Sequence, residues 1–223
     1  MNAEFFDANG YFSVPQVLSV PECAAIATLA QPGADSVGNR CLLSSAWCVA
    51  LADRLRRHAL LSTLVPAGHV AVQCTYFEKS IARNWLVPIH QDLSIPVAER
   101  VDESGLQGWS QKDGEWFVQP PVSVLEQLVA VRLHLDVCTA DDGPLKVVPG
   151  SHVLGCLSPE AAIRARSAGV EVSCQSDLGG ALVMRPMLLH ASSKSVGSGK
   201  RRVLHFVFGP PQLPHGLRWQ TAV

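Results

Sequence analysis

The pattern that most limits the fold of this chain is a series of short segments in which apolar and polar residues alternate. In the segment 129–137, apolar residues take every second position and Arg132, His134 and Asp136 lie between them. This two-residue period is that of a strand with one buried face. Turn residues separate six further predicted strands: 70–79, 145–148, 170–173, 180–186, 188–193 and 201–208. Many short strands joined by turns predict a β-sandwich or barrel.

Two helices are predicted ahead of most of these strands, packed on one sheet. Ser19 followed three residues later by Glu22 is a capping-box signal, and it predicts a helix that stops before Pro32-Gly33. A second helix is predicted over 45–61, where alanine and leucine supply an apolar stripe. Residues 5–18 are predicted to form an entry loop and a short strand.

The composition is that of a globular protein. Of 223 residues, 48% are hydrophobic and 17% are charged, and the net charge is −1. We therefore expect one domain over residues 1–223, a monomer or homodimer, with no nucleic-acid or membrane partner. The seven cysteines are not arranged in C-x-x-C pairs, which favours reduced thiols and a cytoplasmic location.

Residues 99–124 differ from the segments around them. They are polar and rich in glycine, and they end in two prolines at 120–121. A long irregular stretch inside a compact domain usually has a function. We expect a flap or insertion over the functional site, and the alternative is a mobile surface loop.

The first candidate for a metal site is His90-Gln91-Asp92. On an extended segment, a histidine and an aspartate two residues apart point to the same side of the backbone and can reach one ion. With a second histidine they would form the 2-His-1-carboxylate face that holds non-haem Fe(II) and leaves three coordination positions open. Without one, a turn histidine beside a solvated aspartate is the commoner interpretation.

His190 is the candidate for the third ligand, because it ends an apolar run and small residues follow it. Arg201 comes eleven residues later, after a glycine-rich turn. A hairpin would bring the two side chains together on one face. A guanidinium can bind a carboxylate through two parallel hydrogen bonds, which is what the far end of a keto-acid co-substrate requires.

These residues lie in motifs that resemble the phytanoyl-CoA dioxygenase family of Fe(II)/2-oxoglutarate oxygenases. The motifs are N-W-L-V-P-I-H-Q-D at 84–92, D-G-P-L-K-V-V-P-G-S-H at 142–152, and H-A-S-S at 190–193 through K-R-R at 200–202. The resemblance spans about residues 10–208. It implies a mainly-β double-stranded β-helix, or jelly roll, with iron in its open mouth.

The resemblance also implies roles for individual residues. Arg201 would bind the distal carboxylate of 2-oxoglutarate, Ser192 would assist it, and Gln91 is a candidate contact for the same co-substrate. O2 would be the other co-substrate. Fe(II) would be held by two histidines and one aspartate: His90, Asp92 and His190.

Three other residues are candidates for binding the co-substrate. Arg132 takes a position that is aromatic in the family's best-known member, and an arginine facing the cavity there would bind a carboxylate of the co-substrate or the substrate. The alternative for Arg132 is an ion pair with Asp136. Lys79 is a candidate contact for an anion, the alternative being a solvated lysine, and Asn84 begins the metal motif.

The predicted activity is oxidation of an unactivated C–H bond in a small molecule, such as a natural-product intermediate or an amino-acid-like compound. Hydroxylation is the first expectation, with desaturation and ring closure as the others, and succinate and CO2 would be released. Two other classes stay open. One is a jelly-roll metalloenzyme that does not use 2-oxoglutarate, such as a cupin-like isomerase or hydrolase, and the other is a catalytically silent small-molecule-binding module.

Overall fold

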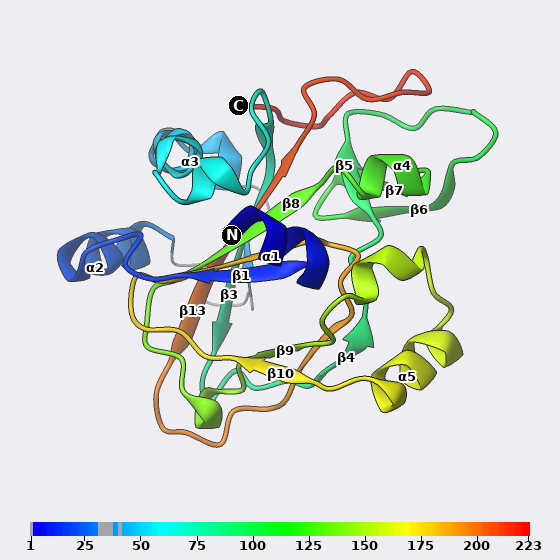
Figure 1. Ribbon diagram of the computed structural model, residues 1–223. Helices are drawn as coiled ribbons and strands as arrows, with labels where there is room; N and C mark the ends of the chain where they lie inside the picture. Colours follow the sequence, from blue (N-terminus) through cyan, green and yellow to red (C-terminus); the bar gives the residue numbers. More distant parts are fainter. Residues whose placement is uncertain (1, 31–37, 40–41) are drawn as a thin grey trace.

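The computed structural model describes residues 2–30, 38–39 and 42–223, and its main body is a pair of antiparallel sheets (Figure 1). The residues that line a cavity come from both sheets. The larger sheet has the strand order β1 (Tyr11–Val14), β11 (Ala181–Met184), β8 (Val129–His134), β13 (Arg201–Gly209), β3 (Val70–Lys79), β2 (Gly38–Asn39). The smaller sheet has the order β10 (Val172–Cys174), β9 (Leu145–Val147), β12 (His190–Ser192), β4 (Val87–His90). This crossed order of antiparallel strands is that of a jelly roll, so the predicted fold class is confirmed.

Helices cover the outer face of the larger sheet. Apolar side chains of α2 (Val20–Leu29) and α3 (Ala46–Arg57) belong to one buried cluster with the outward-facing side chains of β8 and β13. In Figure 1 both helices lie at the left, whereas α5 (Pro159–Ala168) lies at the right, beside β4. The described residues also form four short 3-10 helices, Leu42–Ser44, Leu61–Thr63, Ala140–Asp142 and Ser151–Leu154.

Alternation along the long strands gives the larger sheet an apolar outer face and a more polar inner face. On β13, Leu204 and Phe206 pack into the helix cluster, whereas Arg201 and His205 line the cavity. A bulge in the pairing of β13 with β3 follows Val207. Because a bulge shifts the alternation by one residue, consecutive residues at 72–73 of β3 both reach the cavity.

Three predictions near the N-terminus are corrected or refined. Residues 5–9, predicted as a loop, belong to α1 (Asn2–Asn9), because the buried ring of Phe6 anchors this turn in the core. The second helix ends at Arg57 instead of 61, since His58 is extended. The first ends at Leu29, and Glu22 accepts a hydrogen bond from the backbone N–H of Ser19 as the capping box requires. Its stop signal, Pro32-Gly33, lies outside the described residues.

The stretch 99–124, predicted to be irregular, contains a β-hairpin whose pairing has one register shift, between Gln107 and Ser110. Strands β6 (Gln107–Lys112) and β7 (Glu115–Gln119) are joined by Asp113-Gly114, whose φ angles are 53° and 84°. Asp-Gly favours this two-residue turn, so the pair itself was a hairpin signal. Strand β7 also pairs with β5 (Ile95–Val97), and α4 (Val122–Leu125) follows.

The helices and the cysteines can be compared with two expectations drawn from the composition. Within the described residues, no helix has the length and apolar character of a membrane span. The six described cysteines are free thiols, and five of them are buried.

Gly143 offers a test of the turn that follows β8. Its φ is +62°, and a Cβ there would lie 2.4 Å from the backbone oxygen of Ser193. We predict that Gly143→Ala lowers the free energy of unfolding by more than the roughly 1–2 kcal/mol of a left-handed alanine, measured by urea denaturation. Gly68→Ala is the control, because Gly68 has φ +83° and nothing within 4 Å of its Cβ position. Equal losses in the two variants would contradict this close approach.

Candidate metal centre

Two histidines and one aspartate converge between the sheets. His90 ends β4 and pairs directly with His190, the first residue of β12, so that their ring centroids are 4.1 Å apart. Asp92 lies in the loop after β4, and its backbone N–H donates to the carbonyl of Pro186 at 2.9 Å. The strand predicted to carry both His90 and Asp92 thus ends at His90, yet the aspartate still faces the histidines.

The side-chain donor atoms face one another across a small gap. His90 Nε2 lies 3.5 Å from one carboxylate oxygen of Asp92, and His190 Nε2 lies 3.6 Å from the other. One donor atom from each residue can be chosen so that all three lie within 4.8 Å. Metal–donor bonds of about 2 Å would place neighbouring donors about 3 Å apart, so small side-chain rotations suffice to fit an ion.

The other nitrogen of each imidazole is occupied. His90 Nδ1 is 2.9 Å from the carbonyl of Pro88, and His190 Nδ1 is 2.8 Å from the carbonyl of Leu188. A carbonyl only accepts, so each Nδ1 carries a hydrogen, and in the neutral ring each Nε2 presents a lone pair to the gap. This backbone support orients both rings as metal ligands require.

The electrostatics of Asp92 and His190 also suit a cation; at His90 burial is outweighed by the carboxylate of Asp92, which raises the pKa of that imidazole in the metal-free protein. Burial lowers the pKa of His190 to about 4, which keeps its imidazole neutral. Burial alone would raise the pKa of Asp92, but His190 and His90 outweigh it and hold that pKa well below its usual value. A carboxylate and a neutral imidazole are the donor forms that a divalent ion binds.

The cavity beside these donors has a volume of about 500 Å³ and an unbalanced charge. Among the described residues, Asp92 is the one carboxylate that lines it, whereas Lys112, Arg132 and Arg201 supply three cations. Its wall away from the metal donors is apolar, with Val72, Ile95, Leu128 and Val207 among the residues that line it. The cavity therefore suits a molecule with both acidic and apolar parts.

Arg201 and Lys79 form a pair of buried cations at the start of β13. They are cross-strand partners, and Lys79 Nζ donates to Ser192 Oγ at 2.6 Å and to the carbonyl of Ser193 at 2.7 Å. Arg201 Nη1 donates to the carbonyl of Gly143 and reaches Ser192 Oγ at 3.5 Å. Its Nε is a buried donor with no acceptor among the described residues. An anion such as a carboxylate would satisfy these donors.

The prediction that His190 and Arg201 lie in one hairpin is wrong. His190 belongs to β12 in the smaller sheet and Arg201 to β13 in the larger one. Both side chains nevertheless line the cavity, because the sheets face each other across it.

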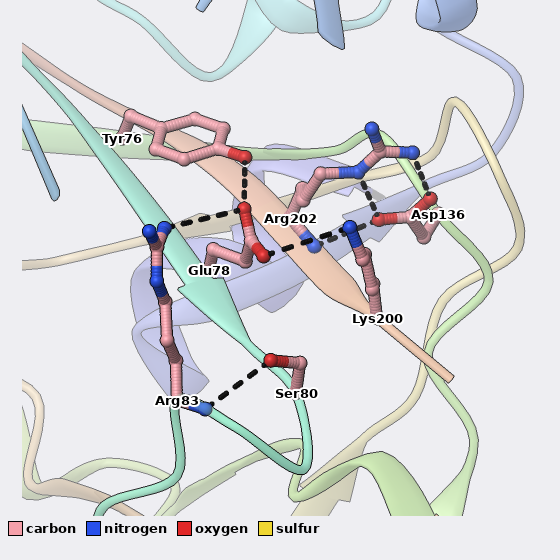
Figure 2. Close-up of polar contacts among 7 residues, drawn as sticks. All are labelled: Tyr76, Glu78, Ser80, Arg83, Asp136, Lys200 and Arg202. Carbon is pink, nitrogen blue, oxygen red and sulfur yellow. Dashed lines mark hydrogen bonds and ion pairs between the residues drawn. The ribbon is translucent and has the colours of Figure 1, made fainter. Parts of the chain in front are cut away.

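A polar cluster on the outer face fixes the ends of the strands that carry Lys79 and Arg201 (Figure 2). The Arg202 side chain donates to both carboxylate oxygens of Asp136, at 2.8 and 2.6 Å, and its backbone N–H donates to the same group at 2.9 Å. Arg202 therefore faces outward, and its neighbour Arg201 is directed into the cavity.

Glu78 plays the matching part on β3 (Figure 2). It is the cross-strand partner of Arg202 and accepts from the hydroxyl of Tyr76 at 2.9 Å. Arg83 and Lys200 lie 3.9 and 4.0 Å from its carboxylate. With Glu78 held on the outer face, the next residue, Lys79, faces inward.

Two other candidates are bonded to backbone groups. Gln91 donates to the carbonyls of Gly155 and Met187 and accepts from the N–H of Leu157. Asn84 donates to the carbonyl of Ser195 and accepts from its N–H. Gln91 reaches the cavity wall and Asn84 does not, and the contacts of both give them a role in positioning loops.

The alternative prediction for Arg132, an ion pair with Asp136, is wrong, because Asp136 is bonded to Arg202. The Arg132 side chain lines the cavity, and its Nη1 lies 3.0 Å from His205 Nδ1. Of the other histidines, His134 is buried without lining the cavity, and His152 donates from Nε2 to the carbonyl of Asp7.

Sequence reasoning missed the residues that the hairpin contributes to the cavity. Lys112 from β6 and Phe117 from β7 both line it, and the ammonium of Lys112 lies 4.8 Å from the centroid of the Phe117 ring. The missed signal was the Asp113-Gly114 turn, which would have predicted strands on both sides.

The comparisons with known proteins agree with this geometry. The family model of phytanoyl-CoA dioxygenase (PhyH) matches residues 6–203, and the chain belongs to that family. Comparison with curated protein sequences gave no significant match.

Several solved structures share the fold. The epimerase SnoN from nogalamycin biosynthesis, in complex with Fe3+, alpha-ketoglutarate and nogalamycin RO, has a TM-score of 0.71 at 17% identity, over 100% of this chain and 94% of SnoN. HygX from Streptomyces hygroscopicus, with nickel and 2-oxoglutarate bound, has a TM-score of 0.62 at 18% identity, over 94% of this chain and 86% of HygX. The alpha-ketoglutarate-dependent carbocyclase SnoK has a TM-score of 0.58 at 14% identity, over 96% of this chain and 87% of SnoK.

The buried lysine gives a pH-dependent prediction. Burial and then the charge of Arg201 lower the pKa of Lys79 to about 7, from the 10.5 of an ordinary lysine. Between these values the unfolded chain binds more protons than the folded chain, so the contribution of Lys79 to stability rises with pH. We predict that the free energy of unfolding of the wild type, minus that of Lys79→Met, increases from pH 7 to pH 10.

The measurement is urea denaturation of the metal-free protein at several pH values. Lys194→Met, which removes an exposed lysine, is the control and should show no such rise. A constant difference between the wild type and Lys79→Met would mean that Lys79 stays charged in the folded protein.

Proposed function

We propose that this protein is a non-haem Fe(II)- and 2-oxoglutarate-dependent dioxygenase that oxidises a C–H bond of a small molecule. The observation that carries the proposal is the presence, in one cavity, of a His-Asp-His donor set and a buried arginine whose Nε has no acceptor among the described residues. Membership of the phytanoyl-CoA dioxygenase family supports it. So do the alpha-ketoglutarate and 2-oxoglutarate named for SnoN and HygX.

In this proposal His90, Asp92 and His190 hold the iron, and Arg201 binds the distal carboxylate of 2-oxoglutarate. When bound, iron and 2-oxoglutarate supply the activation of O2, with release of succinate and CO2 and removal of hydrogen from an unactivated C–H bond. Lys79 adds a second donor near that carboxylate, whose binding would favour the charged ammonium, and the Ser192 hydroxyl contacts both Lys79 and Arg201.

The chain's own residues orient and enclose the reactants. The backbone carbonyls of Pro88 and Leu188 keep each Nδ1 protonated, so that each Nε2 faces the iron. The apolar cluster that contains Ile95 and Leu128 keeps water from one end of the cavity. We propose that the β6–β7 hairpin acts as the flap over the site, contributing Lys112 and Phe117.

Hydroxylation is the reaction proposed first, with desaturation and ring closure as further outcomes of the same hydrogen removal. The epimerase SnoN and the carbocyclase SnoK share the fold, which supports this wider range. We further propose that the chain is a single cytoplasmic domain, active as a monomer or homodimer, with no nucleic-acid partner.

Two observations argue against the other classes. A cupin-like isomerase or hydrolase without 2-oxoglutarate has no need of the buried Arg201 and Lys79 pair. A catalytically silent binding module has no need of three oriented metal donors.

Arg201 provides the test of co-substrate binding. We predict that Arg201→Met raises the Kd for 2-oxoglutarate about 100-fold, because it removes two charge-assisted hydrogen bonds. The measurement is calorimetric titration of 2-oxoglutarate into the protein loaded with Mn(II), which replaces iron without reacting with oxygen. Arg218→Met, at an exposed arginine paired with Glu99, is the matched control and should bind normally. An unchanged Kd in Arg201→Met would remove Arg201 from the co-substrate site.

A further inference from the structure

The cavity holds a second buried cation that neither the metal donors nor the Arg201 pair accounts for. Arg132 is 8% exposed and has no carboxylate within ion-pair distance among the described residues. Its one hydrogen-bond partner among them is His205, and its guanidinium lies 5.7 Å from the ring centroid of Phe77. A buried guanidinium without an anion is costly, so a site of this kind favours a negatively charged ligand.

The hydrogen bond to His205 fixes the state of that imidazole. A guanidinium only donates, so His205 Nδ1 must accept and the ring proton must sit on Nε2. Burial and then the charge of Arg132 lower the pKa of His205 to about 3, which keeps the ring neutral. Among the described residues nothing accepts a hydrogen bond from Nε2. Arg132 and His205 thus present several donors to the cavity and no competing acceptor.

The strand register separates this pair from the proposed site for the distal carboxylate. Arg132 and His205 are cross-strand partners on β8 and β13, and Arg201 lies four residues before His205. Four residues of a strand span about 13 Å, and Phe77 and Val203 occupy the inner row between the two pairs. Along the backbone the Arg132–His205 pair is therefore set apart from Arg201, although burial and then the charge of Arg201 lower the pKa of Arg132.

The Arg132–His205 pair lies between the metal donors and the apolar end of the cavity. Arg132 and His205 line the same cavity as the metal donors Asp92 and His190. Beyond them along β13, Val207 belongs to the apolar cluster with Ile95 and Leu128. A molecule held by an acidic group at Arg132 would lie beside the metal centre with its apolar part in this cluster.

The charges of the filled site also favour an anionic substrate. Fe(II) with Asp92 carries a net charge of +1, and 2-oxoglutarate carries −2 when both carboxylates are ionised. Arg201 and Arg132 add +2, so the filled site would keep a positive charge even with Lys79 neutral. One further anionic group would balance these charges, and Lys112 on the flap hairpin would still add a positive charge.

We propose that Arg132 and His205 bind an acidic group of the substrate, so that the oxidised molecule is a small carboxylic acid with an apolar body. This inference rests on the proposed function, because it takes the Arg201 site to be filled by 2-oxoglutarate. Lys112, on the flap hairpin, adds a third cation to the cavity and favours the entry of an anion.

The test is a set of matched acid and amide probes, which have nearly the same shape and differ in charge. Acetate, benzoate, phenylacetate and hexanoate are each compared with the corresponding amide. Each is titrated calorimetrically into the protein loaded with Mn(II) and 2-oxoglutarate. We expect at least one acid to bind tenfold or more tightly than its amide in the wild type. This preference should fall to within twofold in Arg132→Met, with the Kd for 2-oxoglutarate unchanged.

Two further variants keep the test decisive. Arg132→Lys retains the charge without the planar fork and should keep a reduced preference for the acid, even if Arg132→Met does not fold. Arg57→Met removes an exposed arginine on α3 and should behave as the wild type.

Three results would overturn the inference. They are no preference for any acid in the wild type, a preference that survives in Arg132→Met, and a loss of 2-oxoglutarate binding in Arg132→Met, which would assign Arg132 to the co-substrate. Failure of the proposed function has a different signature. The wild-type protein with Mn(II) would then not bind 2-oxoglutarate, whereas acid binding to the Mn(II) protein would still depend on Arg132 if the anion site exists.

Discussion

The direct pairing of His90 with His190 is the contact on which the candidate site depends. It joins the end of β4 to the start of β12, and a shift of one residue in this register would turn one imidazole away from the cavity. Backbone contacts around the pair hold the register. Asp92 is bonded to Pro186, and the amide of Gln91 binds two carbonyls and one N–H from other segments. The loops around β12 and the metal donors are thus one connected unit.

The second constraint is electrostatic and comes from the opposite sheet. Strands β3, β8 and β13 direct Lys79, Arg132 and Arg201 inward, while Asp136 and Glu78 hold the flanking side chains on the outer face. The protein buries these cations without carboxylate partners among the described residues. Such an arrangement has a cost in stability that is recovered when anions bind. The smaller sheet therefore supplies the metal donors, and the larger sheet supplies the charges that select anionic ligands.

Much of this arrangement could be predicted from the sequence, because it depends on local patterns. Alternation along 129–137 separated Arg132 from its apolar neighbours, and the motifs around His90, His190 and Arg201 identified the donor set. What depends on long-range packing could not be derived in the same way. The separation of His190 and Arg201 into two sheets and the bonding of Asp136 to Arg202 are set by strand order, which neither spacing nor charge reveals. The hairpin at 107–119 had a local signal in Asp113-Gly114, which the polar composition around it obscured.

The most direct test of the central claim is anaerobic titration of the metal-free protein with Fe(II), followed by 2-oxoglutarate. We predict that one Fe(II) binds per chain and that a weak visible charge-transfer band then appears when 2-oxoglutarate chelates the iron. His190→Ala should lose the band, because two of the three donors cannot complete the facial site. Binding of Fe(II) without a band on adding 2-oxoglutarate would contradict the co-substrate assignment. Failure to bind Fe(II) at all would show that His90, Asp92 and His190 do not form a metal centre.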